Sequence, residues 1–133
     1  MDSGNEKFQA SNLAHIGKAV VAILKHPDET ANRYLATASF NPSHNEIVSI
    51  IEELTGSKLK VTHLKSEDLQ KIGEEKLSLG DYRAFSDLLK VYNHQDGIGN
   101  AVEGEASANE LIKLPGEDLR ETLRAYLTKV GAI

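Results

Sequence analysis

The sequence contains no cysteine and no tryptophan, and only 5% of its 133 residues are aromatic. Without cysteine there can be no disulfide framework and no thiolate chemistry, which suits an intracellular protein. With so few aromatic residues, the core must be mainly aliphatic. The longest apolar run extends from Ala19 to Leu24, far too short to cross a bilayer of about 30 Å. The polar first residues do not resemble a signal peptide, so we expect a cytoplasmic protein with no membrane partner.

Basic residues are in the minority, and they gather in no part of the chain. The sequence has 15 lysine and arginine residues against 20 aspartate and glutamate residues, which gives a net charge of −5. Nucleic-acid binding needs a basic face, so we expect no nucleic-acid partner. An apolar fraction of 40% and a length of 133 residues are typical of one globular domain.

Hydrophobic periodicity predicts a helix-rich α/β chain with about five helices and two short strands. The predicted helices cover Asn12–Lys25, Ser43–Thr55, Ser66–Glu75, Asp81–Tyr92 and Glu117–Lys129. The predicted strands cover Tyr34–Ser39 and Leu59–His63, which suit half-buried extended segments. A helix, a strand, a helix and a strand therefore follow one another in the first half of the chain.

Several of these boundaries rest on residues with a known local effect. Pro27 should end the first helix, because proline disfavours helical geometry in the residue before it. Ser43 and Glu46 have the spacing of a capping box at the start of the second helix. Gly56 stands where a C-cap glycine would end that helix.

The chain offers little that could hold a nucleotide or carry out catalysis. The segment from Gly97 to Gly104 lacks the G-x-G-x-x-G spacing, follows no predicted strand and opens no predicted helix, so a flexible surface loop is favoured. Tyr82 is not followed four residues later by lysine, so the Tyr-x-x-x-Lys pair, in which an ammonium lowers the pKa of a phenol, is missing. The histidines lack the i, i+4 spacing of helical metal ligands. We therefore predict no catalytic, cofactor-binding or metal-binding residue.

Three segments carry a family resemblance: His15–Leu24 (HIGKAVVAIL), Thr30–Tyr34 (TANRY) and Glu52–Gly56 (EELTG). They resemble the C-terminal part of NmrA-like, isoflavone-reductase-like proteins, especially fungal ones, which are atypical members of the short-chain dehydrogenase superfamily. The resemblance covers nearly the whole chain and is strongest from Leu13 to Leu64. The family commonly has Asp-Ile-Gly at the start of the first helix, whereas this chain has His15 at the first position.

The resemblance implies that residues 1–133 form a single, partial NmrA-like domain. It would be the C-terminal, substrate-side portion of a Rossmann-type protein, with the N-terminal dinucleotide-binding half absent. The family implies an NAD(P)H-dependent oxidoreductase that acts on a small-molecule substrate, in secondary-metabolite biosynthesis by family habit, with NADP as cofactor. Two alternatives stay open: a non-catalytic regulatory or interaction module, and a gene-model fragment without a function of its own.

The family places its substrate over the C-terminal part, and this implies a set of substrate-binding candidates. They are Phe40, Asn41, His15, His63, Tyr82 and Phe85. His63 has a competing interpretation as a partly buried strand histidine, and the two aromatic residues as the inward stripe of one helix.

The two most apolar helix faces predict a further property. In a whole family member, the faces of Ile16–Leu24 and Ile47–Leu54 would pack partly against a sheet. Alone, they should leave an exposed apolar patch larger than the few hundred Å² that is usual for a monomer. We therefore expect self-association or marginal stability.

Overall fold

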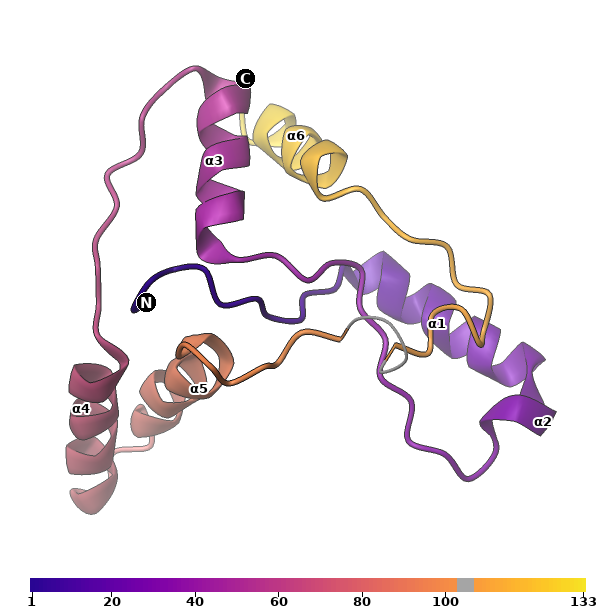
Figure 1. The fold of residues 1–133 in the computed structure, drawn as a ribbon, viewed down its shortest axis with the longest axis horizontal. Helices are drawn as coiled ribbons and strands as arrows, with labels where there is room; N and C mark the ends of the chain where they lie inside the picture. The colour runs from indigo at the N-terminus through magenta and orange to yellow at the C-terminus, as the bar shows by residue number, and fades with distance from the viewer. Residues whose placement is uncertain (103–106) are drawn as a thin grey trace. The chain divides into compact units, whose positions relative to one another are not determined.

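The computed structural model describes residues 1–102 and 107–133, and Figure 1 shows this part of the chain as helices joined by extended segments. The helices are α1 (Leu13–Lys25), α2 (Pro27–Thr30), α3 (His44–Thr55), α4 (Ser66–Ser78), α5 (Ala84–His94) and α6 (Leu119–Lys129). The predicted helix-rich fold class is confirmed. In the described ranges, no helix is long and apolar enough to span a membrane.

The chain divides into two compact units, each built from two separate stretches. The first unit comprises Met1–Phe8 and Ser43–Asn100, and the second comprises Gln9–Pro42 and Ala101–Ile133. The first unit therefore holds α3, α4 and α5, and the second holds α1, α2 and α6.

The second unit has a small aliphatic core beside α1. Ala19 of α1 packs with Ile112 and Leu114, which are 1% and 6% exposed. Partly buried apolar residues surround this cluster: Ala22, Ile23, Leu35 and Leu111. Because the core is aliphatic and small, much of the apolar face of α1 remains outside it.

A corner after α1 confirms the predicted role of Pro27. The helix ends at Lys25, and His26 has the non-helical angles φ −123° and ψ 54°. Pro27 then starts α2, a single turn that the sequence analysis missed. The hydroxyl of the buried Thr30 donates to the carbonyls of Ile23 and His26, at 3.1 and 2.7 Å, and so holds the corner closed.

The predicted strand at Tyr34–Ser39 is not formed. These residues are extended, but their neighbour is a turn rather than a second strand: the Ala108 N–H donates to the Ala36 carbonyl at 2.8 Å, and the Asn109 side chain donates to the Ala38 carbonyl at 2.8 Å. Near this segment the structure has an isolated antiparallel bridge, between Ala10 and Phe40. The carbonyls that a neighbouring strand would use are thus bound by a turn.

The predicted strand at Leu59–His63 is also wrong. This segment connects α3 to α4, and all its residues are exposed and lack strand pairing. Alternating side chains favour a strand only where one face of it can be buried against a sheet. The segment has no such sheet beside it in its unit.

Both predicted caps of α3 are confirmed. The Ser43 hydroxyl accepts from the Glu46 N–H at 3.2 Å, and the Glu46 carboxylate accepts from the Ser43 N–H at 2.6 Å. Gly56 closes the helix in the left-handed region, with φ 66°. A side chain other than glycine or asparagine is disfavoured there.

Helices α4 and α5 pack closely where α4 has a glycine. A Cβ added at Gly73 would lie 2.8 Å from Cγ of Leu88, so the close approach depends on the missing side chain. Beside this contact, the Lys76 ammonium donates to the carboxylate of the buried Asp87 at 2.6 Å. The two helices are therefore joined by close packing and by a partly buried ion pair.

An N-terminal strap, residues Met1–Phe8, binds to the start of α4. The Asp2 N–H donates to the Leu64 carbonyl at 2.9 Å, and its carboxylate accepts from the Ser66 N–H at 2.8 Å. The residue at the N-cap position, Lys65, has no acceptor in its side chain, so Asp2 supplies the cap from a distant part of the sequence. The Ser66 hydrogen bond lowers the pKa of the Asp2 carboxyl.

Candidate functional site

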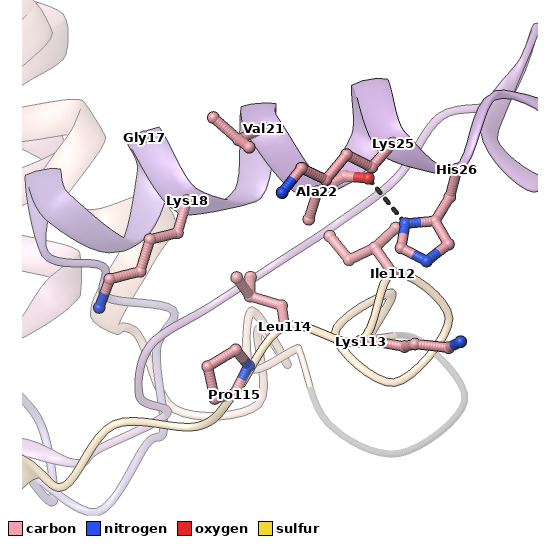
Figure 2. A pocket seen from close by; sticks show the side chains of 10 residues that line it. All are labelled: Gly17, Lys18, Val21, Ala22, Lys25, His26, Ile112, Lys113, Leu114 and Pro115. Carbon is pink, nitrogen blue, oxygen red and sulfur yellow. Dashed lines mark hydrogen bonds between the residues drawn. The ribbon is translucent and has the colours of Figure 1, made fainter.

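A pocket of about 480 Å³ lies within the second unit, between one face of α1 and residues 112–115 (Figure 2). Its lining residues are Gly17, Lys18, Val21, Ala22, Lys25, His26, Ile112, Lys113, Leu114 and Pro115. Sites for small molecules are typically of this size and mostly apolar, with a few polar groups at chosen points. The pocket is therefore the candidate site of the described chain.

Helical spacing explains the α1 wall. Gly17, Val21 and Lys25 follow one another at intervals of four residues, and Lys18 and Ala22 do the same, so all five lie on one helix face. Gly17 leaves this wall open, because a Cβ there would meet no atom within 4 Å.

A tight turn explains the opposite wall. The Leu114 N–H donates to the Asn109 carbonyl at 2.7 Å, and the Lys113 N–H donates to the Glu110 carbonyl at 3.1 Å. Lys113 has φ 52°, a left-handed conformation that non-glycine residues rarely adopt. Ile112 and Leu114 are buried in the core, whereas Lys113 between them is exposed at the edge of the pocket.

The charged groups of the pocket all have one sign. Lys18, Lys25 and Lys113 line it, and no carboxylate does. Lys18 pairs with Glu117 at 3.4 Å, outside the pocket lining, whereas the described residues offer no ion pair to Lys25 or Lys113. Among the described residues, the pocket is therefore an apolar space with lysine ammonium groups and no carboxylate in its lining.

Glu117 is fixed beside the N-terminus of α1. Its carboxylate accepts from the Asn12 side-chain amide at 2.7 Å. This hydrogen bond, aided by Lys18, lowers the pKa of Glu117, so the carboxylate stays ionised. Asn12 therefore positions Glu117 instead of capping α1 with its own side chain.

His26 closes one end of the pocket in a defined orientation. Its Nδ1 lies 2.8 Å from the Ala22 carbonyl, as the dashed line in Figure 2 shows. A carbonyl oxygen can only accept, so Nδ1 carries the proton of this hydrogen bond. In the neutral ring, Nε2 then keeps its lone pair for an acceptor role.

Three of the six predicted substrate-binding residues belong to the second unit, but none of them lines the pocket. His15 is fully buried in the first turn of α1, and neither ring nitrogen has a hydrogen-bond partner among the described residues. The Asn41 side chain donates to the Val102 carbonyl at 2.9 Å and accepts from the Val102 N–H at 2.7 Å, so its amide is engaged within the fold. Phe40 is half-buried beside its bridge to Ala10.

The other three predicted residues belong to the first unit. Tyr82 and Phe85 stack with ring centroids 6.1 Å apart and are 77% and 58% exposed, so the interpretation of an inward core stripe is wrong for them. His63 is exposed beside an open, polar hollow that Asp2 and Asp96 also line, and not partly buried in a strand. The structure thus brings the rings of Tyr82 and Phe85 into contact, whereas His63 lines a hollow to which neither of them contributes.

A group of rings that the sequence analysis missed also lies in the first unit. His44 and His94 meet with ring centroids 4.4 Å apart, and Phe8 of the strap lies edge-on to His94 at the same distance. Burial lowers the pKa of both histidines. The two histidines are too far apart in sequence for any spacing rule to pair them.

Three backbone amides that a dinucleotide pyrophosphate could use are already occupied. Backbone amides at a helix N-terminus or a glycine turn bind phosphate when they are free. Here the Ser66 N–H at the start of α4 is bound by Asp2, and the N–H groups of Gly97 and Gly99 are bound by the Glu6 carboxylate at 2.9 and 2.7 Å. Residues 103–104, the end of the segment compared with a nucleotide loop, lie outside the described residues.

Three of the four arginines have a partner nearby in the sequence: Arg33 donates to the Glu29 carbonyl, Arg83 pairs with Asp81, and Arg124 pairs with Glu121. The Arg83 guanidinium lowers the pKa of the Asp81 carboxyl to about 2. Metal ligands do not gather in the part of the chain that the structure describes: it contains no group of three histidine or acidic side chains that could hold an ion.

A sequence model of the NmrA-like family matches residues 2–123. The chain belongs to the NmrA-like family. The family membership predicted from the HIGKAVVAIL, TANRY and EELTG segments is thus confirmed.

Two fungal relatives that are similar to this NmrA-like chain are named oxidoreductases. The chain is 33% identical over 129 residues to "Oxidoreductase poxI" of Penicillium oxalicum, and the aligned residues cover 95% of this chain and 41% of the relative. It is 27% identical over 128 residues to "Oxidoreductase aprR" of Aspergillus flavus, and the aligned residues cover 96% of this chain and 43% of the relative. The chain thus spans about two fifths of the length of these curated relatives. No solved structure matches it.

Proposed function

We propose that this NmrA-like chain is the substrate-side portion of an NAD(P)H-dependent oxidoreductase. The observation that carries the proposal is the combination of a small-molecule-sized apolar pocket with the family membership. The names of the two relatives support an oxidoreductase role for the whole protein.

The division of labour follows from what hydride transfer requires. The protein must hold a dinucleotide and place the substrate carbon beside its nicotinamide. The pocket beside α1 can hold an apolar substrate body, whereas the amides of Ser66, Gly97 and Gly99 are already bound by carboxylates. We therefore place the residues that hold NADP in a dinucleotide-binding half that this chain does not contain.

The finer parts of the proposal rest on the family resemblance. They are a small-molecule substrate from secondary metabolism and a cytoplasmic location. The predicted contacts from Phe40, Asn41, His15, His63, Tyr82 and Phe85 belong to the same proposal. The pocket adds its own lining residues to these candidates.

Calorimetric titration with NADPH tests the division of labour. The 133-residue chain alone should not bind NADPH with micromolar affinity. The chain should then be co-expressed with the part of the Penicillium oxidoreductase that the match leaves uncovered. We expect the co-purified pair to bind NADPH, with that part alone as the control. Micromolar binding by the chain alone would overturn the proposal.

A second candidate function, a cofactor-free interaction module, is favoured by the exposed apolar face of α1. Leu13, Val20 and Leu24 are 86%, 52% and 74% exposed. Such a face suits a protein partner or a second copy of the chain. Sedimentation velocity should show self-association that Leu24→Lys weakens, whereas Leu79→Lys, at a position that is 79% exposed outside this face, leaves it unchanged. A monodisperse monomer at all concentrations would remove self-association from this alternative.

A further inference from the structure

We propose that the pocket between α1 and residues 112–115 binds a small amphipathic organic anion: a flat apolar body that carries a carboxylate. The inference deepens the proposed function, because it names the substrate class, and it rests on that function for the biological role. The binding itself can be measured without turnover.

The apolar part of the ligand is indicated by the walls. Val21 and Ala22 on α1 line the pocket in Figure 2 together with Ile112, Leu114 and Pro115 from the other wall. Two of these, Ile112 and Leu114, are anchored in the core, so this wall is held in place by packing before a ligand arrives. A preformed apolar slot favours a rigid ring system, since neither partner then loses much conformational freedom.

The charge of the ligand is indicated by the rim. Lys25 comes from the α1 wall and Lys113 from the opposite wall, and neither has an ion-pair partner in the described ranges. Lys18 adds a third ammonium group, which Glu117 partly neutralises from outside the lining. Among the described lining residues a cationic ligand would meet like charges, whereas a carboxylate can pair with an ammonium group on either wall.

The backbone at Lys113 identifies this turn as a candidate ligand contact. Its φ of 52° places it in the left-handed region, where a residue with a side chain is strained. Strain of this kind concentrates at ligand clamps and functional turns. Here the turn keeps Ile112 and Leu114 in the core while Lys113 lies at the mouth of the pocket.

Gly17 provides a direct way to close the pocket. A Cβ at this position would meet no atom within 4 Å, and Gly17 lines the pocket, so we expect a larger side chain to extend into the space of the ligand. Leucine is a good helix former, which makes Gly17→Leu a blocking variant that should keep its fold. Circular dichroism checks that it does.

Binding of naphthoate and of its neutral isostere naphthamide to the full chain tests the inference by calorimetry. We expect naphthoate to bind about 1.5-fold to fivefold more tightly, the range for exposed ion pairs. The double variant Lys25→Gln/Lys113→Gln should lose this preference and keep its affinity for naphthamide. Lys129→Gln, which removes an exposed lysine of α6 outside the lining, should behave as the parent chain. Gly17→Leu should weaken both ligands.

Several outcomes would overturn the inference. They are equal affinity for the two ligands, no binding of either, a Lys129→Gln effect as large as that of the double variant, or unchanged binding by Gly17→Leu. The NADPH titration tests the proposed function, and the naphthoate titration tests the ligand class of the pocket, so either result can contradict its own hypothesis alone. Naphthoate binding without NADPH binding by the co-expressed pair would keep the pocket and remove the oxidoreductase role, and the reverse result would remove the ligand class alone.

Discussion

Two helical glycines in different surroundings allow a matched test of the packing between α4 and α5. At Gly73 an added Cβ would lie 2.8 Å from both Cγ and Cδ2 of Leu88 and 3.6 Å from the Ala84 carbonyl oxygen. At Gly17 of α1 the same atom would meet nothing within 4 Å. The substitution to alanine is chemically identical at the two positions, so any difference in its effect reports on the neighbours.

The expected magnitudes follow from these distances. Alanine gains about 0.5–1 kcal/mol over glycine inside a helix, and Gly17→Ala should keep this gain in full. At Gly73 the clash involves Cγ, which lies near the backbone of Leu88, so the two helices must separate or the leucine must leave its rotamer. Overpacking of this kind costs about 1–3 kcal/mol. The net effect of Gly73→Ala should be a loss of roughly 0.5–2 kcal/mol.

Urea unfolding followed by far-ultraviolet circular dichroism measures both effects. The midpoint should rise for Gly17→Ala and fall for Gly73→Ala. A double-mutant cycle with Leu88→Ala isolates the contact, because in that background Gly73→Ala should become neutral or stabilising. If Gly73→Ala stabilises the parent chain as much as Gly17→Ala does, or if the cycle shows no coupling, the packing of α4 on α5 described above is refuted.

The strap and the histidine pair give two further predictions. Asp2→Ala should lower the free energy of unfolding by about 0.5–2 kcal/mol, because the Ser66 N–H loses its cap, whereas Asp2→Asn should keep most of it; equal losses would show that the cap is not the cause. The lowered pKa values of His44 and His94 mean that the folded chain binds fewer protons than the unfolded chain between those values and about 6.5. Stability should therefore be full above about pH 6.5 and fall as the pH drops through that value. Thermal melts across this window should show the fall, and His94→Phe should reduce it; a pH-independent melting temperature would contradict the prediction.

The caps of α3 and the end of α1 were predicted correctly, because residues close together in the sequence determine them. The capping box of Ser43 and Glu46 and the left-handed Gly56 involve residues only a few positions apart, and the structure has all three as predicted. Pro27 ended α1 as expected, but it also begins α2, where proline suits the first position and Asp28 and Glu29 favour the first turn. The sequence therefore contains a local signal for the start of α2.

The two strand predictions failed because a strand is not a local structure. Tyr34–Ser39 and Leu59–His63 have suitable side chains, and both are extended, but a strand forms only when a second chain segment pairs with it. Nothing within either segment could reveal that one of them meets the turn after Ala108 and that the other has no pairing strand among the described residues.

The candidate pocket could not be predicted for the same reason. Its walls, α1 and residues 112–115, come from opposite ends of the sequence, and no spacing rule connects them. The conformation of Lys113 is also invisible in a sequence, because lysine gives no hint of a left-handed backbone. The substrate contacts predicted from the family remain predictions.

The exposed connection between α3 and α4 should be a site of limited proteolysis, and contacts elsewhere in the chain should hold the two fragments together. Lys60 lies in an extended, exposed segment, the form in which proteases prefer their substrates. After a cut there, Asp2 on one piece would still bind Leu64 and Ser66 on the other, and Glu6 would still bind the amide of Gly97. A denaturing gel would then show two fragments where gel filtration shows one particle, because the strap and the packing of Ala19 against Ile112 and Leu114 both join the two pieces.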